Sequence, residues 1–120
     1  MINLNELAKN SLLTAERREK NGAKISTETL SMLKHCAGEV VEATEAYKAY
    51  KDSETVAKNP NGSEVSFYDS DRKEKFASEL ADVICCVLII SGKEDIDISS
   101  ALSECMSRNA KRAFGQGDKL

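Results

Sequence analysis

The apolar run "VICCVLII", from Val83 to Ile90, is the feature that most constrains how this chain folds. It follows Asp82 in a stretch whose spacing predicts one helix, from about residue 70 or 71 to Ser91, with Gly92 as its stop signal. After Asp82 this helix is apolar on nearly every side, so several of its faces must be covered. We therefore expect it at the centre of a helical bundle or at an interface between subunits.

Three other segments have helical periodicity, with Gly38 as the one breaker inside the second of them, and the one proline lies in the loop before the third expected helix. Residues 52–71, "DSETVAKNPNGSEVSFYDSD", contain several turn signals and read as a long loop. The expected helices are about Leu4–Lys20, stopping at Asn21 and Gly22; from after Ser26 or Thr27 to about Lys51; and about Ser99–Phe114, with Ala101, Leu102, Cys105, Met106 and Ala110 inward.

These patterns predict an all-α fold: a bundle of four or five helices in one domain, residues 1–120, with a long loop between its second and third helices. A chain of 120 residues offers limited cover for so apolar a third helix. We therefore expect the protein to form oligomers, either a homodimer or a homotetramer.

Charge and cysteine content exclude some classes of function. The formal net charge is −3 and neither sign forms a long block, which argues against binding to a nucleic-acid polymer. The four cysteines form no CxxC pair and the amino terminus resembles no secretory signal, so we expect reduced thiols and a cytoplasmic protein. The apolar run is also too short for a bilayer, which requires about twenty residues.

Two pairs of acidic residues with the same spacing point to a metal site. Glu39 and Glu42 lie three residues apart on the expected second helix, and Glu79 and Asp82 repeat this spacing on the third. If these helices pack antiparallel, the four carboxylates converge and need cations to stay charged. Oxygen ligands without His or Cys favour a hard ion, Mg²⁺ or Mn²⁺.

The alternative interpretation is a solvated acidic face. Acidic residues three apart are common on exposed helices, and either pair alone fits that interpretation. Asp82 does not, because it interrupts a stretch where packing alone would favour an apolar residue. Glu45 extends the first row, but Lys48 lies within helical reach of it, and we expect Glu45 to have a surface role.

The segments "GEVVEATEAY" and "KFASELADVICCVLI" resemble the ExxE and ExxD motifs of the all-alpha nucleoside triphosphate pyrophosphohydrolase superfamily. This superfamily includes MazG, the dimeric dUTPases, the dCTP pyrophosphatases and the phosphoribosyl-ATP pyrophosphohydrolases. The likeness covers most of the chain and is greatest to the small, single-module MazG-like proteins, in helix order, chain length and the "ELADV" signature.

The resemblance implies Mg²⁺-dependent hydrolysis of a nucleoside or deoxynucleoside triphosphate to the monophosphate and pyrophosphate. It also implies a role in removing non-standard nucleotides. The metal ligands would be Glu39, Glu42, Glu79 and Asp82, and either Glu42 or Glu39 would be the general base.

Candidate substrate contacts come from three places in the chain. On the last helix, "CMSRNAKR" places Asn109 and Arg112 at the spacing of the family's Lys, Asn and Arg cluster, but Cys105 stands where a Lys is often found. Lys111 or Arg108 would supply that missing charge. Lys75 resembles a family position that contacts phosphate, although a solvent-exposed lysine is an equal alternative. His35, one turn before Glu39, is a further candidate, and Phe67, Tyr68, Tyr47 and Tyr50 are the aromatic candidates for holding the base.

Two other functional classes remain open. A non-catalytic helical dimerisation or regulatory module would explain the apolar third helix but leaves Asp82 unexplained. A di-iron carboxylate bundle would explain the acidic residues, but that class uses Glu-x-x-His pairs. The single histidine, His35, lies outside such a pair.

Overall fold

The computed structural model describes residues 2–114. Its elements, in chain order, are α1 (Leu4–Lys20), α2 (Thr29–Asp52), β1 (Thr55–Lys58), β2 (Glu64–Phe67), α3 (Ser70–Lys93) and α4 (Ile98–Ala113). The four helices lie where the sequence predicts them, so the largely helical class is confirmed. Within the described residues, no helix has both the length and the apolar character of a membrane span.

The described chain divides into two compact units. One is Leu30–Val87, and the other combines the residues before Leu30 with those after Val87. The expected arrangement of all helices as one bundle in a single domain stays a prediction.

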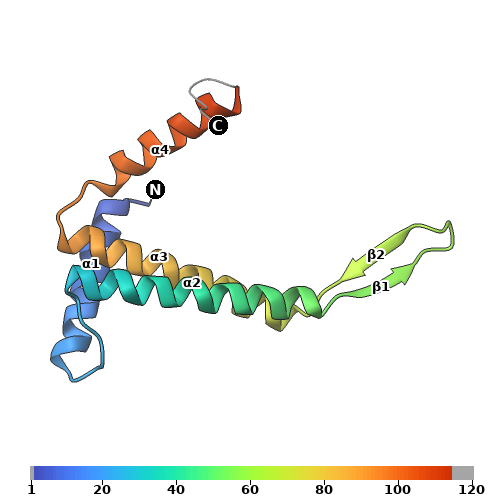
Figure 1. The fold of residues 1–120 in the computed structure, drawn as a ribbon, viewed down its shortest axis with the longest axis horizontal. Coiled ribbons are helices and arrows are strands. Elements are labelled where there is room, and N and C mark those ends of the chain that lie inside the picture. Colours follow the sequence, from blue (N-terminus) through green and yellow to red (C-terminus); the bar gives the residue numbers. More distant parts are fainter. Residues whose placement is uncertain (1, 115–120) are drawn as a thin grey trace. The chain divides into compact units, whose positions relative to one another are not determined.

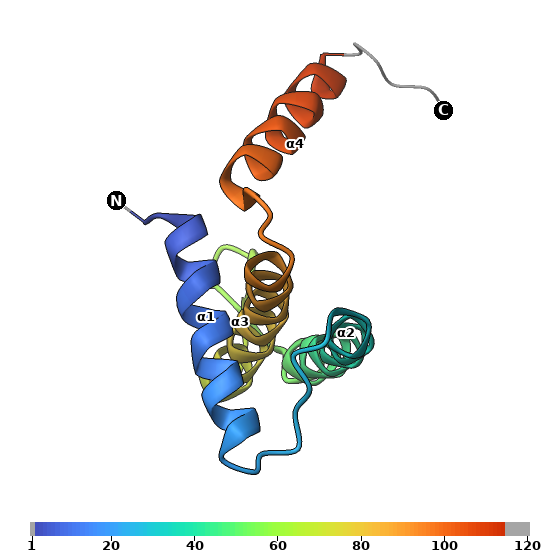
Figure 2. The same ribbon diagram turned by 90° about the vertical axis from the view of Figure 1, so that its left-hand side faces the viewer.

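In the unit Leu30–Val87, α2 and α3 lie side by side and run in opposite directions, joined by the hairpin of β1 and β2 (Figure 1). The ring of Tyr47, late in α2, lies 5.3 Å from that of Phe76, early in α3. Met32, Ala43 and Cys86 are buried in this unit, and Met32 has the most completely buried large side chain. Figure 2, which views α2 and α3 nearly end-on, shows the two helices as neighbours.

The prediction of a plain loop over residues 52–71 is wrong, because this segment contains an antiparallel hairpin. Thr55 pairs with Phe67, and the ladder continues to Lys58 opposite Glu64. The turn needs Gly62, whose φ of +85° favours a residue without a Cβ. The strands escaped prediction because each has only four residues, all of them exposed, so no buried face imposes an alternating pattern.

In the other unit, α1 and the start of α4 are tied together by polar side chains. Asn5 donates to Asp97 Oδ1 at 2.9 Å and accepts from the Ser99 backbone N–H at 3.1 Å. Asp97 in turn caps α4 by accepting from the Ser100 N–H at 3.0 Å. These bonds, together with the burial of Ala8 and Ala15, position α1 in this unit.

Gly92 does not end α3, contrary to the sequence prediction. The helix continues to Lys93, and the residue with positive φ after it is Asp95, at 52°. Gly92 is small for a different reason: a Cβ at this position would lie 2.6 Å from the backbone oxygen of Ala8. The glycine therefore allows the close approach of α1.

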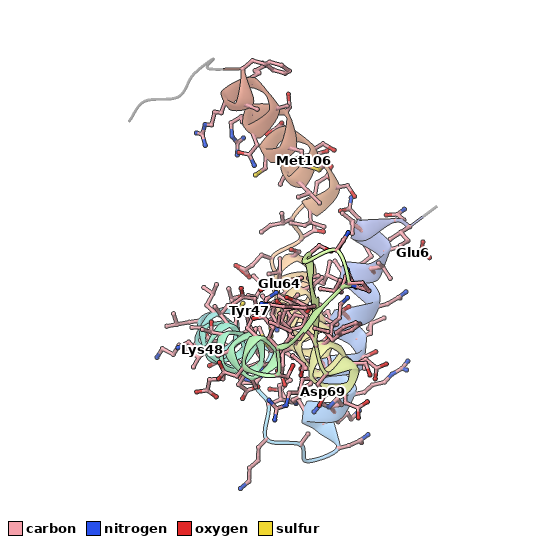
Figure 3. The ribbon with its side chains drawn as sticks, turned by 90° about the vertical axis from the view of Figure 1, so that its right-hand side faces the viewer. Glu6, Tyr47, Lys48, Glu64, Asp69 and Met106 are labelled. Carbon is pink, nitrogen blue, oxygen red and sulfur yellow. The ribbon has the colours of Figure 1, made fainter. Side chains whose placement is uncertain are left out.

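The predicted inward face of α4 is not covered in the described chain. No residue of α4 is buried, and Leu102 and Met106 are 43% and 63% exposed (Figure 3 labels Met106). The sequence pattern correctly showed an amphipathic helix, but periodicity does not reveal whether a partner covers the apolar side.

Candidate metal centre

Three carboxylates from two helices meet in the unit Leu30–Val87. One carboxylate oxygen each from Glu39 and Glu42 on α2 and from Glu79 on α3 lie within 4.8 Å of one another. The three-residue spacing on α2 puts two of them on adjacent turns, and the antiparallel neighbour supplies the third. Within residues 2–114 no other group of His, Cys, Asp or Glu has this geometry.

Glu79 is the unusual member of this carboxylate cluster because it is only 5% exposed. Its Oε2 and the Oε2 of Glu39 are buried and, among the residues that the structure describes, have no hydrogen-bond partner. An ionised carboxylate oxygen that has lost both water and donors is costly to keep. A second positive group near these two oxygens would remove that cost.

Glu42 is the exposed member of the cluster, and its neighbours control its protonation. The negative charge of Glu39, and then that of Glu79, raises the pKa of Glu42 above its usual range. Loss of hydration raises this pKa further, and so does a hydrogen bond to one or the other of these carboxylates, which Glu42 can donate only when it carries a proton. Without a cation, a proton on Glu42 is thus the cluster's own means of reducing repulsion.

Each of the other two glutamates has a positive or proton-donating neighbour one turn earlier on its own helix. His35 Nε2 lies 3.0 Å from Glu39 Oε1 on α2, and Lys75 Nζ lies 2.6 Å from Glu79 Oε1 on α3. The hydrogen bond to Glu79 and then the charge of Glu79 raise the pKa of Lys75, so it stays protonated. His35 and Lys75 are themselves exposed, whereas the carboxylates that they contact are largely buried.

Asp82 lies outside the carboxylate cluster. It is exposed one turn beyond Glu79 on α3, and its charge contributes weakly to the raised pKa of Lys75. Three of the four predicted ligands are therefore brought together, and the ligand role of Asp82 stays a prediction.

The candidate phosphate contacts on α4 belong to the other unit. Asn109, Lys111, Arg112 and Arg108 are all exposed there. Asn109 donates to Cys105 Sγ at 3.8 Å, a long contact within the same helix. Their role as substrate contacts stays a prediction.

The donor set suits a small hard cation. Oxygens in one octahedral Mg²⁺ shell lie about 3–4 Å apart, from bond lengths of about 2.1 Å. One oxygen from each member of the carboxylate cluster lies within 4.8 Å of the other two, so only small side-chain adjustments are needed to reach that geometry. The orphaned Oε2 atoms of Glu39 and Glu79 offer the negative charge that such an ion would bind.

An aromatic cluster and a cavity lie next to this site, toward the hairpin. The rings of Tyr47, Tyr50, Tyr68 and Phe76 contact one another, with centroids 5.0–6.2 Å apart. Lys51 Nζ lies 4.4 Å from the centre of the Tyr68 ring. Figure 3 shows Tyr47 on the side of α2 nearer α3, and Lys48 on the outer side.

The cavity, of about 490 Å³, lies at the base of the hairpin. Its lining residues are Asp52, Ser53, Thr55, Phe67, Tyr68, Asp69 and Arg72. Sequence reasoning singled out Phe67 and Tyr68 but missed Phe76, Lys51 and Arg72. The spacing of Tyr47, Tyr50 and Lys51 on one helix was the available signal for part of this group.

The cysteines do not take part in the carboxylate cluster. All four are free thiols, and Cys86 is buried. Burial, with smaller contributions from nearby negative groups, raises the pKa of Cys86 to about 11. This thiol is therefore neutral and unreactive near neutral pH.

Comparison with known proteins adds no relative: no family model, curated protein or solved structure matches this chain. The resemblance to the MazG-like proteins therefore rests on the two acidic motifs, and the functional argument on the carboxylate cluster.

Proposed function

We propose that this protein is a Mg²⁺-dependent hydrolase that converts a nucleoside or deoxynucleoside triphosphate to the monophosphate and pyrophosphate. The observation that carries the proposal is Glu79, a carboxylate that is 5% exposed and whose Oε2 has no hydrogen-bond partner among the described residues. One of its two oxygens lies within 4.8 Å of an oxygen of Glu39 and an oxygen of Glu42. A packed helix pair has no structural use for that arrangement, but a cation site does.

Glu39, Glu42 and Glu79 would hold the ion, with Asp82 as a further ligand. A divalent ion there would offset the charge of the triphosphate and acidify a bound water. Glu42 is the better general base of the two candidates, because Glu39 Oε1 is already paired with His35. It takes the proton of the attacking water as the new oxygen bond to the α-phosphorus forms and the bond to the pyrophosphate oxygen breaks.

The cavity at the base of the hairpin supports the nucleoside part of the proposal. Arg72, which lines it, precedes Glu79 by seven residues on α3, or about 10 Å at 1.5 Å per residue. A nucleoside triphosphate can span that distance, with its base against Phe67 or Tyr68 and its phosphates near Lys75. Of the proposed contacts from α4, Lys111 and Arg112 would add positive charge and Asn109 a neutral hydrogen-bond donor.

We also propose a homodimer or homotetramer, which an exposed apolar face of the unit Leu30–Val87 supports. Val40, Leu80 and Ile84 are between 45% and 59% exposed. A groove of about 320 Å³ between the helices has almost wholly apolar walls, including Val40 and Leu80. A face of this kind is the usual sign of a protein interface. The four free cysteines suit the reducing cytoplasm in which we place the protein.

The same apolar face favours the second candidate, a non-catalytic helical dimerisation module. That candidate accounts for Val40 and Ile84 but gives no use for the orphaned oxygen of Glu79. Only a measurement of nucleotide hydrolysis distinguishes the dimerisation module from the hydrolase.

The test is product analysis with a panel of NTPs and dNTPs, including non-standard bases, in the presence of Mg²⁺. We expect at least one nucleotide to yield equal amounts of monophosphate and pyrophosphate, and EDTA to stop the reaction. Folded protein that turns over no nucleotide would leave the dimerisation module as the better account.

A further inference from the structure

Lys75 contacts Glu79, the carboxylate with which a bound metal cation is expected to interact most strongly. Its Nζ lies 2.6 Å from Glu79 Oε1, while the other oxygen of that carboxylate is buried and has no partner in the described chain. The lysine side chain is 69% exposed and its acceptor 7% exposed, so the ammonium reaches the carboxylate from the solvent side.

His35 has the corresponding position on the other helix. It precedes Glu39 by four residues, as Lys75 precedes Glu79. Because α2 and α3 run in opposite directions, these two side chains approach the carboxylate cluster from opposite ends. Of the two, Lys75 is the permanent charge, and it contacts the most buried carboxylate.

We propose that Lys75 is an exchangeable counter-ion: it neutralises Glu79 in the metal-free protein, leaves when a divalent cation binds, and then binds the polyphosphate anion. This inference rests on the proposed function only in its last step. A doubly charged ion that contacts several carboxylates at once outcompetes a single ammonium bound to one oxygen. No backbone movement is needed, because the exposed lysine stem can rotate freely.

The exchange places the lysine where the substrate needs it. Once released, Nζ remains tethered one helical turn from the metal ligands, within reach of phosphate oxygens that the cation holds. In the metal-free protein, Glu79 is thus neutralised by the group that later binds the substrate.

The first test is a Mn²⁺ titration of the metal-free protein at neutral pH, with free Mn²⁺ followed by electron paramagnetic resonance. Lys75→Met removes the competitor and should tighten Mn²⁺ binding by roughly two- to fivefold, the range that one exposed ion pair provides. Lys75→Arg keeps the charge and should bind as the wild type does. Lys73→Met is the matched control, because Lys73 is exposed on the same helix and makes no ion pair within the described residues. Unchanged or weaker binding by Lys75→Met would overturn the exchange.

The second test measures the lysine directly. Acetylation by an N-hydroxysuccinimide ester, read by mass spectrometry, should become faster at Lys75 relative to Lys73 when Mg²⁺ is added. Inorganic tripolyphosphate with excess Mg²⁺ should then protect Lys75 again. An acetylation rate of Lys75 that does not change when Mg²⁺ is added would contradict its release from Glu79. A rate that does not change when tripolyphosphate is added would contradict its binding to phosphate. Neither readout needs nucleotide turnover, so the hydrolase proposal can fail while the exchange stands.

Discussion

At the residue scale, the carboxylate cluster is an arrangement of charge that the chain balances in three different ways. Glu39 has His35, Glu79 has Lys75, and exposed Glu42 has a raised tendency to take up a proton. The sequence predicted that these carboxylates would meet, because helical spacing fixes which side chains share a face. It could not predict that Asp82 would stay exposed. The burial of one side chain depends on its rotamer and on how closely the two helices pack there, and neither appears in the periodicity of the sequence.

Glu42 gives the metal-free protein a distinctive dependence on pH. Its pKa is raised in the folded state above the ordinary value of 4.5, so the folded state binds this proton more tightly than the unfolded state does. The resulting stability is present below pH 4.5 and is lost as the pH rises through the folded pKa. In EDTA, we expect the wild type to lose stability between acid and neutral pH relative to Glu42→Gln.

Urea unfolding of both proteins over this pH range measures the difference. Mg²⁺ at neutral pH should then stabilise the wild type more than Glu42→Gln. Parallel pH curves for the two proteins would show that the carboxylates do not repel one another as the structure indicates.

At the scale of elements, the sequence predicted the helices, but it did not predict the hairpin or the contacts between residues far apart in the chain. The first helix was predicted at Leu4–Lys20 and lies there, because Asn21 and Gly22 give a strong local stop. The hairpin was missed because its strands bury nothing, and Gly92 was misread because its contact with Ala8 joins residues far apart in the chain. Long-range contacts of this kind have no signature in a single sequence.

Two glycines in helices offer a matched test of that contact. Gly92→Ala would place a Cβ 2.6 Å from the Ala8 backbone oxygen, and we expect a loss of about 1–3 kcal/mol in the free energy of unfolding. Gly38→Ala, within α2, meets nothing within 4 Å and should instead gain about 0.5–1 kcal/mol from helix propensity. Chemical denaturation of both variants and the wild type measures the two changes in the free energy of unfolding. Equal changes at the two positions would contradict the close approach of α1 and α3.

At the scale of the whole molecule, the apolar face of the unit Leu30–Val87 is exposed in the described chain. The sequence indicated that the helix now seen as α3 needs cover, and Ile84 at 59% exposure shows that the described chain does not fully provide it. Composition and periodicity show that an apolar helix face must be covered, but they do not show which surface covers it, because assembly depends on the shapes of two surfaces.

The oligomer proposal predicts a specific effect at that face. Ile84→Lys introduces a charge into an apolar contact, and we expect it to convert a dimer or tetramer to monomer. Lys48→Glu, a charge change on the outer side of α2, is the control and should leave the mass unchanged (Figure 3). Sedimentation equilibrium gives both masses. A wild-type protein that is already monomeric at micromolar concentration would contradict the proposal.

The most direct test of the central claim is pyrophosphate release by three purified proteins side by side, with Mg²⁺ and the best nucleotide of the panel. Glu79→Gln removes the buried ligand charge and should lower turnover by about a hundredfold or more. Glu45→Gln, an exposed glutamate on α2 outside the carboxylate cluster, should retain the wild-type rate. Turnover that survives Glu79→Gln, or that Glu45→Gln lowers equally, would show that the carboxylate cluster is not the catalytic site.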